Sequence, residues 1–229
     1  MSSGRTLTLN SGYSIPVVGL GTWQSSPSEV ANTVQHALGY GYRHIDAAAC
    51  YGNEVEVGQG IRASGVPRSD ILVTSKLWNT HHEPGDVEDA LGETLKVRSI
   101  GVSNFTRERI QGLLRTVKMK PAVNQIEAHP YLQQPSLLDW LKIHNLVALA
   151  YSHTGNNIYG KPRAIDDTVV VGVADNLGRQ PAQAIDLVGS TARDGCFAKT
   201  RKKGVRELIN ATRGRTVNDL YEAHKRAKR

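Results

Sequence analysis

Three residues in the first third of the chain, Asp46, Tyr51 and Lys76, could together form a proton donor. A phenol is a weak acid, with a free pKa of ~10. A neighbouring ammonium group stabilises the phenolate that remains when the proton leaves, and a carboxylate beside the ammonium keeps it charged and in place. Such a set can act as a general acid near neutral pH. Taken singly, each residue is more typical of an ordinary structural role: Tyr51 of a loop aromatic, Lys76 of a surface charge and Asp46 of a strand-end cap.

Polar side chains also stand at or near the ends of later expected strands. They are Ser103, Asn104, Gln125, Tyr151, Ser152, Lys199 and Thr200. If the strands are parallel, their carboxyl ends meet at one edge of a sheet. The series then indicates a single binding site at that edge.

The histidines and cysteines lack the spacing of metal ligands. His81 and His82 are adjacent to each other, the other histidines are scattered, and Cys50 and Cys196 are far apart. Closely spaced Cys and His pairs are typical of zinc sites, and regular cysteine spacings of disulfide frameworks. We therefore expect neither a metal site nor a disulfide framework.

Segments with strand and helix patterns alternate along the chain. A hairpin is expected around Asn10-Ser11-Gly12, and the first helix is expected to begin at Ser26, with Glu29 completing a capping box. The expected strands are residues 17–21, 43–47, 71–75, 97–102, 122–127, 147–152 and 196–200. The later expected helices are residues 53–64, 86–96, 106–117, 135–144, 166–177, 206–211 and 219–226, and residues 182–188 are compatible with one more.

This alternation predicts parallel strands joined by crossover helices, which leaves two architectures. A doubly wound sheet would usually begin with a glycine-rich phosphate loop. Val18-Gly19-Leu20-Gly21-Thr22 has two of the required glycines and lacks the third. A (β/α)8 barrel needs no such loop and places function at the carboxyl ends of many strands.

The alternation is interrupted at the junction of Lys96 and Val97. A helix expected over residues 86–96 runs directly into the strand expected over residues 97–102. Connections between such elements normally span about 2–6 residues. A helix-to-strand junction with no connection is therefore unusual.

The 229 residues are expected to form one domain, with a basic C-terminal segment at residues 197–229. That segment holds 11 Lys+Arg and 3 Asp+Glu, so it accounts for the net charge of +7. It could be a solvated helix or bind phosphate groups, and nucleic-acid binding is a remote alternative. No apolar run approaches the ~20 residues of a membrane span. With no secretion signal either, we expect a cytoplasmic monomer.

Several motifs resemble those of the aldo-keto reductases. The first runs from Gly41 to Ala48 and continues through Glu54 to Val57-Gly58. Four more segments occur in the family's order: Val73-Thr74-Ser75-Lys76-Leu77-Trp78, Ile100-Gly101-Val102-Ser103-Asn104-Phe105, Asn124-Gln125-Ile126-Glu127-Ala128-His129-Pro130 and Ala150-Tyr151-Ser152. The resemblance is good over residues 5 to about 180 and loose beyond.

The resemblance implies a (β/α)8 TIM barrel that binds NADP(H) and reduces an aldehyde or ketone. Tyr51 would be the general acid, with Lys76 as its activating partner and Asp46 as the partner of Lys76. Trp23 and Trp78 would wall the substrate pocket. The cofactor would be held by Thr22, Ser103, Asn104, Gln125, Tyr151, Ser152, Lys199, Thr200 and Arg206.

The chain departs from the family pattern at the Lys96–Val97 junction, among other places. The family has there a strand that supplies a catalytic histidine, so the barrel is expected to lack about one βα unit. The family's cofactor-phosphate motif is reduced to Phe197-Ala198-Lys199-Thr200, with its arginine displaced to Arg206. These departures predict weak or absent turnover, and a catalytically impaired cofactor-binding protein is the alternative function.

Overall fold

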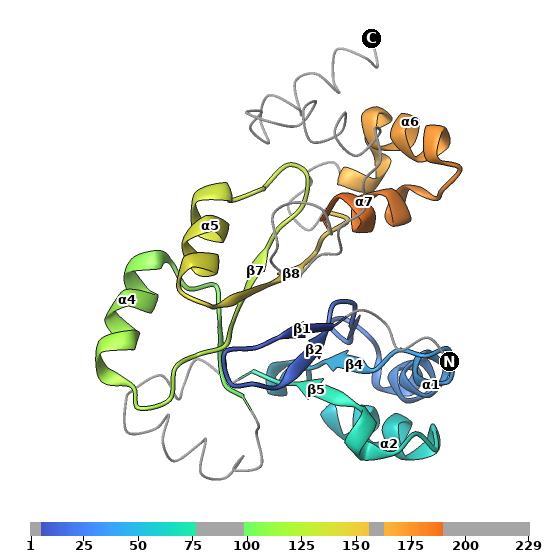
Figure 1. Cartoon of the computed structure of the whole chain (residues 1–229). Coiled ribbons are helices and arrows are strands. Elements are labelled where there is room, and N and C mark those ends of the chain that lie inside the picture. The colour runs from blue at the N-terminus through green and yellow to red at the C-terminus, as the bar shows by residue number, and fades with distance from the viewer. Residues whose placement is uncertain (1–5, 77–98, 156–162, 190–229) are drawn as a thin grey trace. The chain divides into compact units, whose positions relative to one another are not determined.

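A computed structural model of the chain describes residues 6–76, 99–155 and 163–189 (Figure 1). The chain divides into two compact units, Met1–Ser99 and Ile100–Arg229, called here the N-terminal unit and the C-terminal unit. Each is described by itself. The helices predicted over residues 86–96, 206–211 and 219–226 and the strand predicted over residues 196–200 lie outside the described residues.

The N-terminal unit begins with the predicted hairpin. Strand β1 (Thr6–Thr8) pairs antiparallel with β2 (Ser14–Pro16). At the turn, the Gly12 amide donates to the carbonyl of Leu9, and Gly12 has a φ of 84°. Glycine adopts this left-handed conformation without the steric penalty of a side chain.

A parallel sheet of three strands forms the centre of this unit. Its strands are β3 (Leu20–Gly21), β4 (His44–Asp46) and β5 (Leu72–Thr74), in that order. They are shorter than the segments predicted from the sequence. The register pairs Gly21 with Asp46 and Asp46 with Thr74, so the carboxyl ends of the three strands are level.

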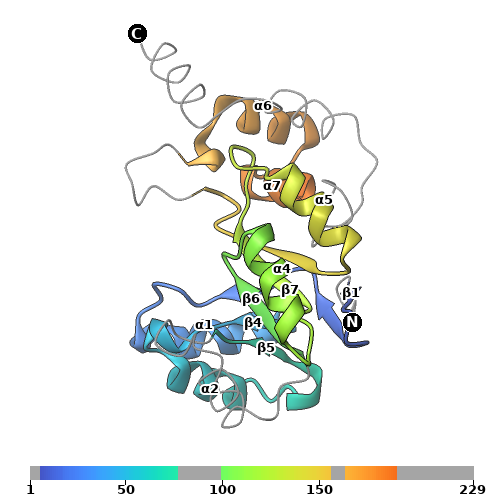
Figure 2. The same ribbon diagram turned by 90° about the vertical axis from the view of Figure 1, so that its left-hand side faces the viewer.

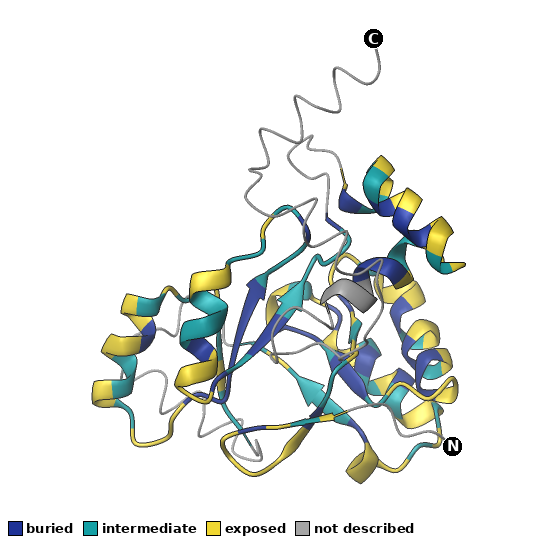
Figure 3. Cartoon of the chain, turned by 45° about the horizontal axis from the view of Figure 1, so that its top comes forward, coloured by how far each residue is buried: buried dark blue, intermediate teal, exposed yellow. Residues whose placement is uncertain are grey.

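Helices α1 (Pro27–Gly39) and α2 (Glu54–Ala63) pack together beside this sheet (Figure 1, Figure 2). Their apolar stripes enter a core with the sheet residues; its buried members are Val30, Val34, Leu38, Ile45, Val57 and Ile71. Figure 3 shows the same pattern, with helices buried along one side and exposed along the other. The stripe predicted for α1 from its helical spacing is confirmed.

The capping box predicted for α1 is not formed. Ser26 is the N-cap and Pro27 opens the helix, but the Ser26 side chain makes no bond to a backbone amide. Its hydroxyl donates to the Glu29 carboxylate, with 3.1 Å between Oγ and Oε2. The two side chains thus satisfy each other instead of the helix end.

The C-terminal unit contains a second parallel sheet of three strands. These are β6 (Gly101–Ser103), β7 (Val123–Glu127) and β8 (Val147–Tyr151), again in sequence order. The helices α4 (Arg107–Thr116) and α5 (Pro135–Ile143) lie in the connections between these strands. Their core includes the buried residues Ile110, Leu141, Leu146 and Ala148. Thr106 caps α4 by accepting a hydrogen bond from the Arg109 amide.

Two further helices follow β8 in the C-terminal unit. They are α6 (Thr168–Leu177) and α7 (Pro181–Gly189), preceded by the short 3-10 turn Ala164–Asp166. Asp167 is the N-cap of α6 and accepts from the Val169 amide. Helix α7 covers residues 182–188, where the sequence was compatible with a helix without clearly predicting one.

The strand order agrees with a barrel, one of the two architectures that the sequence left open. In both sheets the strands are parallel and neighbours in space are neighbours in sequence. A doubly wound sheet reverses its strand order, whereas a barrel does not. Among the described residues the sheets are not closed, and β5 and β6 are each the outer strand of a sheet. No helix of the described part is long and apolar enough to cross a membrane.

Candidate active site

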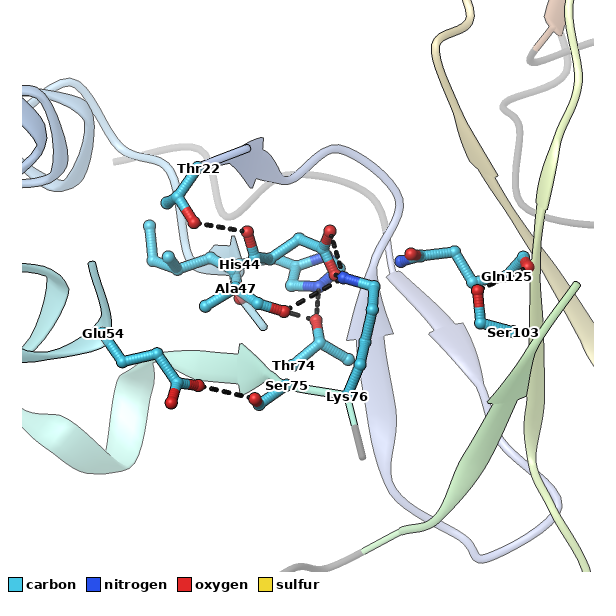
Figure 4. A network of polar contacts seen from close by, with 11 residues as sticks. Thr22, His44, Ala47, Glu54, Thr74, Ser75, Lys76, Ser103 and Gln125 are labelled. Atoms are coloured by element: carbon cyan, nitrogen blue, oxygen red, sulfur yellow. Dashed lines mark hydrogen bonds and ion pairs between the residues drawn. The ribbon is translucent and has the colours of Figure 1, made fainter. Parts of the chain in front are cut away.

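An ion pair between Asp46 and Lys76 lies at the carboxyl end of the N-terminal sheet. Asp46 is the last residue of β4 and is paired with Thr74, so Lys76 follows just beyond the end of β5. Lys76 Nζ lies 3.0 Å from Asp46 Oδ1, 2.9 Å from Oδ2 and 3.0 Å from the carbonyl oxygen of Ala47 (Figure 4). These three contacts match the three donors of an ammonium group, so the charge is both balanced and fixed in position.

Tyr51 stands beside this ion pair. It ends the 3-10 turn Ala49–Tyr51 that follows β4, and Gly52 closes the turn with a φ of 66°. Lys76 Nζ lies 5.1 Å from the centre of the Tyr51 ring, within the range of a cation–π contact. Among the described residues, the Tyr51 hydroxyl makes no hydrogen bond. The structure thus brings together the three residues in which the sequence suggested proton chemistry.

A buried histidine supports the same strand ends. His44 precedes Asp46 by two residues on β4, is 1% exposed, and its Nε2 lies 2.5 Å from Thr74 Oγ1. Burial lowers the pKa of His44, and the charge of Asp46 opposes that effect. A neutral imidazole therefore links β4 to β5. No pattern in the sequence indicates this contact, because it joins side chains 30 residues apart.

Thr22 and Trp23 follow β3 at the same end of the sheet. The backbone amide and the hydroxyl of Thr22 both donate to the carbonyl of Asp46, at 3.0 and 3.1 Å. Thr22 is buried, whereas Trp23 is 48% exposed. Thr22 thus contacts the Asp46 backbone, and the exposed Trp23 ring is available to a ligand.

Two residues next to Tyr51 belong to the site although sequence reasoning missed them. Asn53 is buried, and its Nδ2 donates to the carbonyls of Thr22 and Ser25. Glu54 accepts a hydrogen bond from Ser75, with 2.6 Å between Oε1 and Oγ. Glu54 belongs to the first motif quoted above, and that motif was the one available signal for it.

The candidate cofactor residues form a separate cluster at the carboxyl end of the C-terminal sheet. The Ser103 hydroxyl and the Asn104 amide both donate to the carbonyl of Gln125, at 3.1 and 2.8 Å. The Tyr151 hydroxyl donates to Asn104 Oδ1 at 3.0 Å. Asn104 and Ser152, which directly follow β6 and β8, have φ values of 58° and 50°. Such left-handed conformations are uncommon outside glycine and gather at functional sites.

The loop after β7 carries a second group of titratable residues. His129 Nε2 lies 3.2 Å from Glu127 Oε1, and burial lowers the pKa of His129 while Glu127 opposes the effect. The Tyr131 hydroxyl donates to Asp167 Oδ2 at 2.5 Å. Burial, together with the Asp167 carboxylate, raises the pKa of Tyr131 well above its ordinary value. Tyr131 therefore stays protonated and fastens this loop to the start of α6.

Four candidate site residues fall outside the described residues: Trp78, Lys199, Thr200 and Arg206. The second wall of the substrate pocket and the phosphate site thus stay predictions. In the part of the chain that the structure describes, no group of three or more His, Cys, Asp or Glu residues could hold a metal ion.

Comparison with known proteins identifies the relatives of this chain. The model of the aldo/keto reductase family matches residues 17–96 and 92–171. A D/L-glyceraldehyde reductase from Hypocrea jecorina is 38% identical, over 81% of this chain and 74% of that protein. Aldo-keto reductase family 1 member A1 of Homo sapiens is 33% identical, over 77% of this chain and 74% of that protein. An aldo/keto reductase crystal structure from Brucella melitensis superposes with a TM-score of 0.74 at 27% identity, covering 96% of this chain and 99% of the other.

These matches are interrupted inside the chain. The family model matches in two pieces that overlap at residues 92–96, immediately before Val97. The alignment with the Hypocrea jecorina protein spans 246 residues, more than the 229 of this chain, although it covers only 81% of the chain. The relative therefore has residues within the aligned span that have no counterpart here, in agreement with the shortened chain that the resemblance implies.

Proposed function

Because the chain belongs to the aldo/keto reductase family, we propose that it reduces an aldehyde or ketone to the alcohol with NADPH. Hydride passes to the carbonyl carbon and Tyr51 protonates the carbonyl oxygen. The observation that carries this proposal is the arrangement of the three side chains: Lys76 is ion-paired with Asp46 at 2.9 Å and lies 5.1 Å from the centre of the Tyr51 ring.

The cluster on the C-terminal sheet fits the nicotinamide end of NADPH. A carboxamide needs both donors and acceptors, and hydroxyl and amide side chains gather at this edge from all three strands. Ser103, Asn104 and Gln125 would hold the carboxamide, and Tyr151 would stack on the ring. The bound cofactor would supply the hydride. Thr22 is proposed as a further contact, and Lys199, Thr200 and Arg206 as the phosphate contacts that favour NADPH over NADH.

The N-terminal site supplies the proton. As the phenolic proton of Tyr51 moves to the substrate oxygen, negative charge grows on the ring. Lys76 lies over that ring and stabilises the charge electrostatically. Asp46 keeps the Lys76 ammonium group in place but also compensates part of its positive charge. The location of the ammonium group beside the Tyr51 ring therefore matters more than the size of its net charge.

The proposed substrates are small carbonyl compounds. One relative is named for D/L-glyceraldehyde, which makes a small aldehyde the first compound to test. Trp23, about half exposed beside Thr22, would pack against the apolar part of the substrate.

We also propose that turnover is weak, because the family resemblance implies that the strand carrying the catalytic histidine is missing from this chain. Loss of one donor that stabilises a developing oxyanion commonly costs ~10²–10³ in rate. The second candidate function, a cofactor-binding protein with little or no turnover, is favoured by the interrupted family match at residues 92–96.

The test combines cofactor binding with steady-state turnover. Fluorescence titration should give a lower Kd for NADPH than for NADH, and Lys199→Ala should remove that preference. NADPH oxidation with D/L-glyceraldehyde and with a reactive aromatic aldehyde then measures turnover. Tyr51→Phe removes the proton donor and should lower kcat by ~10²–10⁴. Tyr40→Phe, at a tyrosine that is 87% exposed after α1, is the matched control and should match the unmodified chain.

Each outcome has a distinct meaning. Equal turnover by Tyr51→Phe and the unmodified chain would refute the role of Tyr51. Tight NADPH binding without measurable turnover would favour the cofactor-binding alternative. Equal Kd values for the two cofactors would refute the phosphate contacts.

A further inference from the structure

The short turn that carries Tyr51 has little to hold it by itself. Inside the turn, the Tyr51 amide donates to Ala48 at 2.9 Å and the Gly52 amide to Ala49 at 3.3 Å. The Tyr51 side chain is half-buried, and within the described residues its hydroxyl makes no hydrogen bond. Apart from the contact of its ring with Lys76, the position of the phenol therefore depends on the residues that anchor the backbone on either side.

Asn53 anchors the turn to the β3 side of the site. It occupies the N-cap position of α2, where an asparagine side chain usually accepts from a helix amide, but here it makes no such bond. Its Nδ2 instead donates to the carbonyls of Thr22 and Ser25, at 3.0 and 3.1 Å. Thr22 in turn donates twice to the Asp46 carbonyl. A short chain of hydrogen bonds thus joins the Tyr51 turn to the end of the strand that carries Asp46.

Glu54 anchors the same turn to the β5 side. Its Oε1 accepts from Ser75 Oγ at 2.6 Å, and Ser75 is the residue immediately before Lys76 (Figure 4). Both side chains are exposed. An exposed hydrogen bond of this kind adds little to folding stability, so its value lies in the positions of the residues that it joins.

We propose that Asn53 and Glu54 are positioning residues that hold Tyr51 at its working distance from Lys76. Asn53 fixes the turn to Asp46, and Glu54 fixes it to Lys76. Neither side chain needs to touch the substrate. The inference rests on the proposed function, because a proton donor must be placed accurately to act: a 1 Å misplacement can cost ~10²-fold in rate.

The exposed Glu54–Ser75 pair gives the cleaner test, because its loss should leave the fold intact. Glu54→Ala and Ser75→Ala each remove the hydrogen bond, whereas Glu54→Gln keeps an oxygen that can accept from Ser75. Ser64→Ala is the control, since it removes side-chain hydrogen bonds at the other end of α2: one to the Ile61 carbonyl at 2.7 Å and one from the Val66 amide at 3.2 Å. Asn53→Ala tests the second anchor. The readouts are kcat, the Kd for NADPH, and hydrogen exchange of the Tyr51 and Gly52 amides.

We expect faster exchange of these two amides in Glu54→Ala, Ser75→Ala and Asn53→Ala, and unchanged exchange in Glu54→Gln and Ser64→Ala. Where the unmodified chain turns over aldehyde, kcat should fall ~10- to 100-fold in Glu54→Ala and Ser75→Ala. The Kd for NADPH should not change, and Glu54→Gln should restore kcat. If the Glu54–Ser75 pair served only folding stability, its loss would not lower kcat while leaving the Kd for NADPH unchanged.

Two results would overturn the inference. One is unchanged exchange in all three anchor variants. The other is faster exchange with an unchanged kcat. If the unmodified chain shows no turnover, the proposed function fails on that ground, and the exchange measurement still decides whether the anchors hold the turn.

Discussion

His44 shows how the burial of a single residue makes folding depend on pH. It is 1% exposed, and burial lowers its pKa below the ordinary value, while the charge of Asp46 raises the pKa by a smaller amount. The folded protein therefore keeps His44 neutral at pH values where the unfolded chain takes up a proton. The contribution of His44 to the free energy of unfolding should be fully present above the unfolded pKa of about 6.5. It should be lost progressively as the pH falls from there toward the lower folded pKa.

The corresponding prediction compares His44→Gln with the unmodified chain. Glutamine does not titrate and can still bond to Thr74. The loss in free energy of unfolding between pH 7.5 and pH 5.5 should shrink in the variant, by at most about 1.4 kcal/mol, because pH 5.5 lies one unit below the unfolded pKa of about 6.5. Urea unfolding at the two pH values measures it. Some loss should persist, because burial also lowers the pKa of His129. His36→Gln, at an exposed histidine of α1, is the control; if His44→Gln behaved like it, burial of His44 would not set the pH dependence.

At the residue scale, the sequence predicted the part of the site that is chemically distinctive. Asp46, Tyr51 and Lys76 stand out because their types complement one another in one reaction. The contacts of His44 with Thr74 and of Asn53 with Thr22 do not stand out, because each joins residues about 30 positions apart. Such pairs become neighbours only through the register of β3, β4 and β5, and a pattern in one sequence does not specify that register.

At the scale of elements, α2 depends on a glycine at its contact with α1. A Cβ at Gly60 would lie 2.4 Å from the Ala31 carbonyl oxygen and 2.9 Å from Val34 Cβ. Both neighbours belong to α1, so neither can move without moving that helix. Gly58, in the same helix, would meet only the flexible Arg62 side chain at 3.6 Å.

The two glycines therefore predict opposite effects of the same substitution. Gly58→Ala should raise the free energy of unfolding by up to about 1 kcal/mol, because alanine favours helix over glycine. Gly60→Ala should lower it by about 1–3 kcal/mol through overpacking. Urea unfolding of both variants measures the difference. Equal effects would show that α1 and α2 can move apart at no cost.

Element positions were largely predictable, and their ends were not. The periodicity that buries Val30, Val34 and Leu38 places α1 correctly, since burying an apolar stripe is what stabilises a helix. The capping box failed because the Ser26 hydroxyl donates to the Glu29 carboxylate, and the residue types alone do not decide between this bond and a bond to the helix amides. Strands such as β3 proved shorter because pairing with a neighbour, and not apolar character, defines a strand.

At the scale of the whole molecule, the barrel type predicted from the sequence is confirmed by the aldo/keto reductase structure from Brucella melitensis. The parallel strands in sequence order agree with it. The missing segment at the Lys96–Val97 junction is implied by the family resemblance, and the direct passage from an expected helix to an expected strand is its local sign. In the described chain, β5 and β6 are each the outer strand of a sheet.

The last prediction concerns that segment. A family-type βα unit inserted between Lys96 and Val97 should supply a partner strand for the outer strands β5 and β6 and also return the histidine. Unpaired edges promote association with other chains, and a barrel needs a consistent set of strands to close. We therefore expect the restored chain to unfold at higher urea concentration, to aggregate less, and to gain at least ~10²–10³ in kcat/KM for a reactive aromatic aldehyde.

A glycine-serine insert of equal length is the control, because it relieves the junction without providing a strand. A second control, the βα unit with its histidine replaced by alanine, separates closure of the sheet from the chemistry. Equal kcat/KM for the unmodified and restored chains would mean that the family's segment is dispensable here and that the short chain works by the residues it already has.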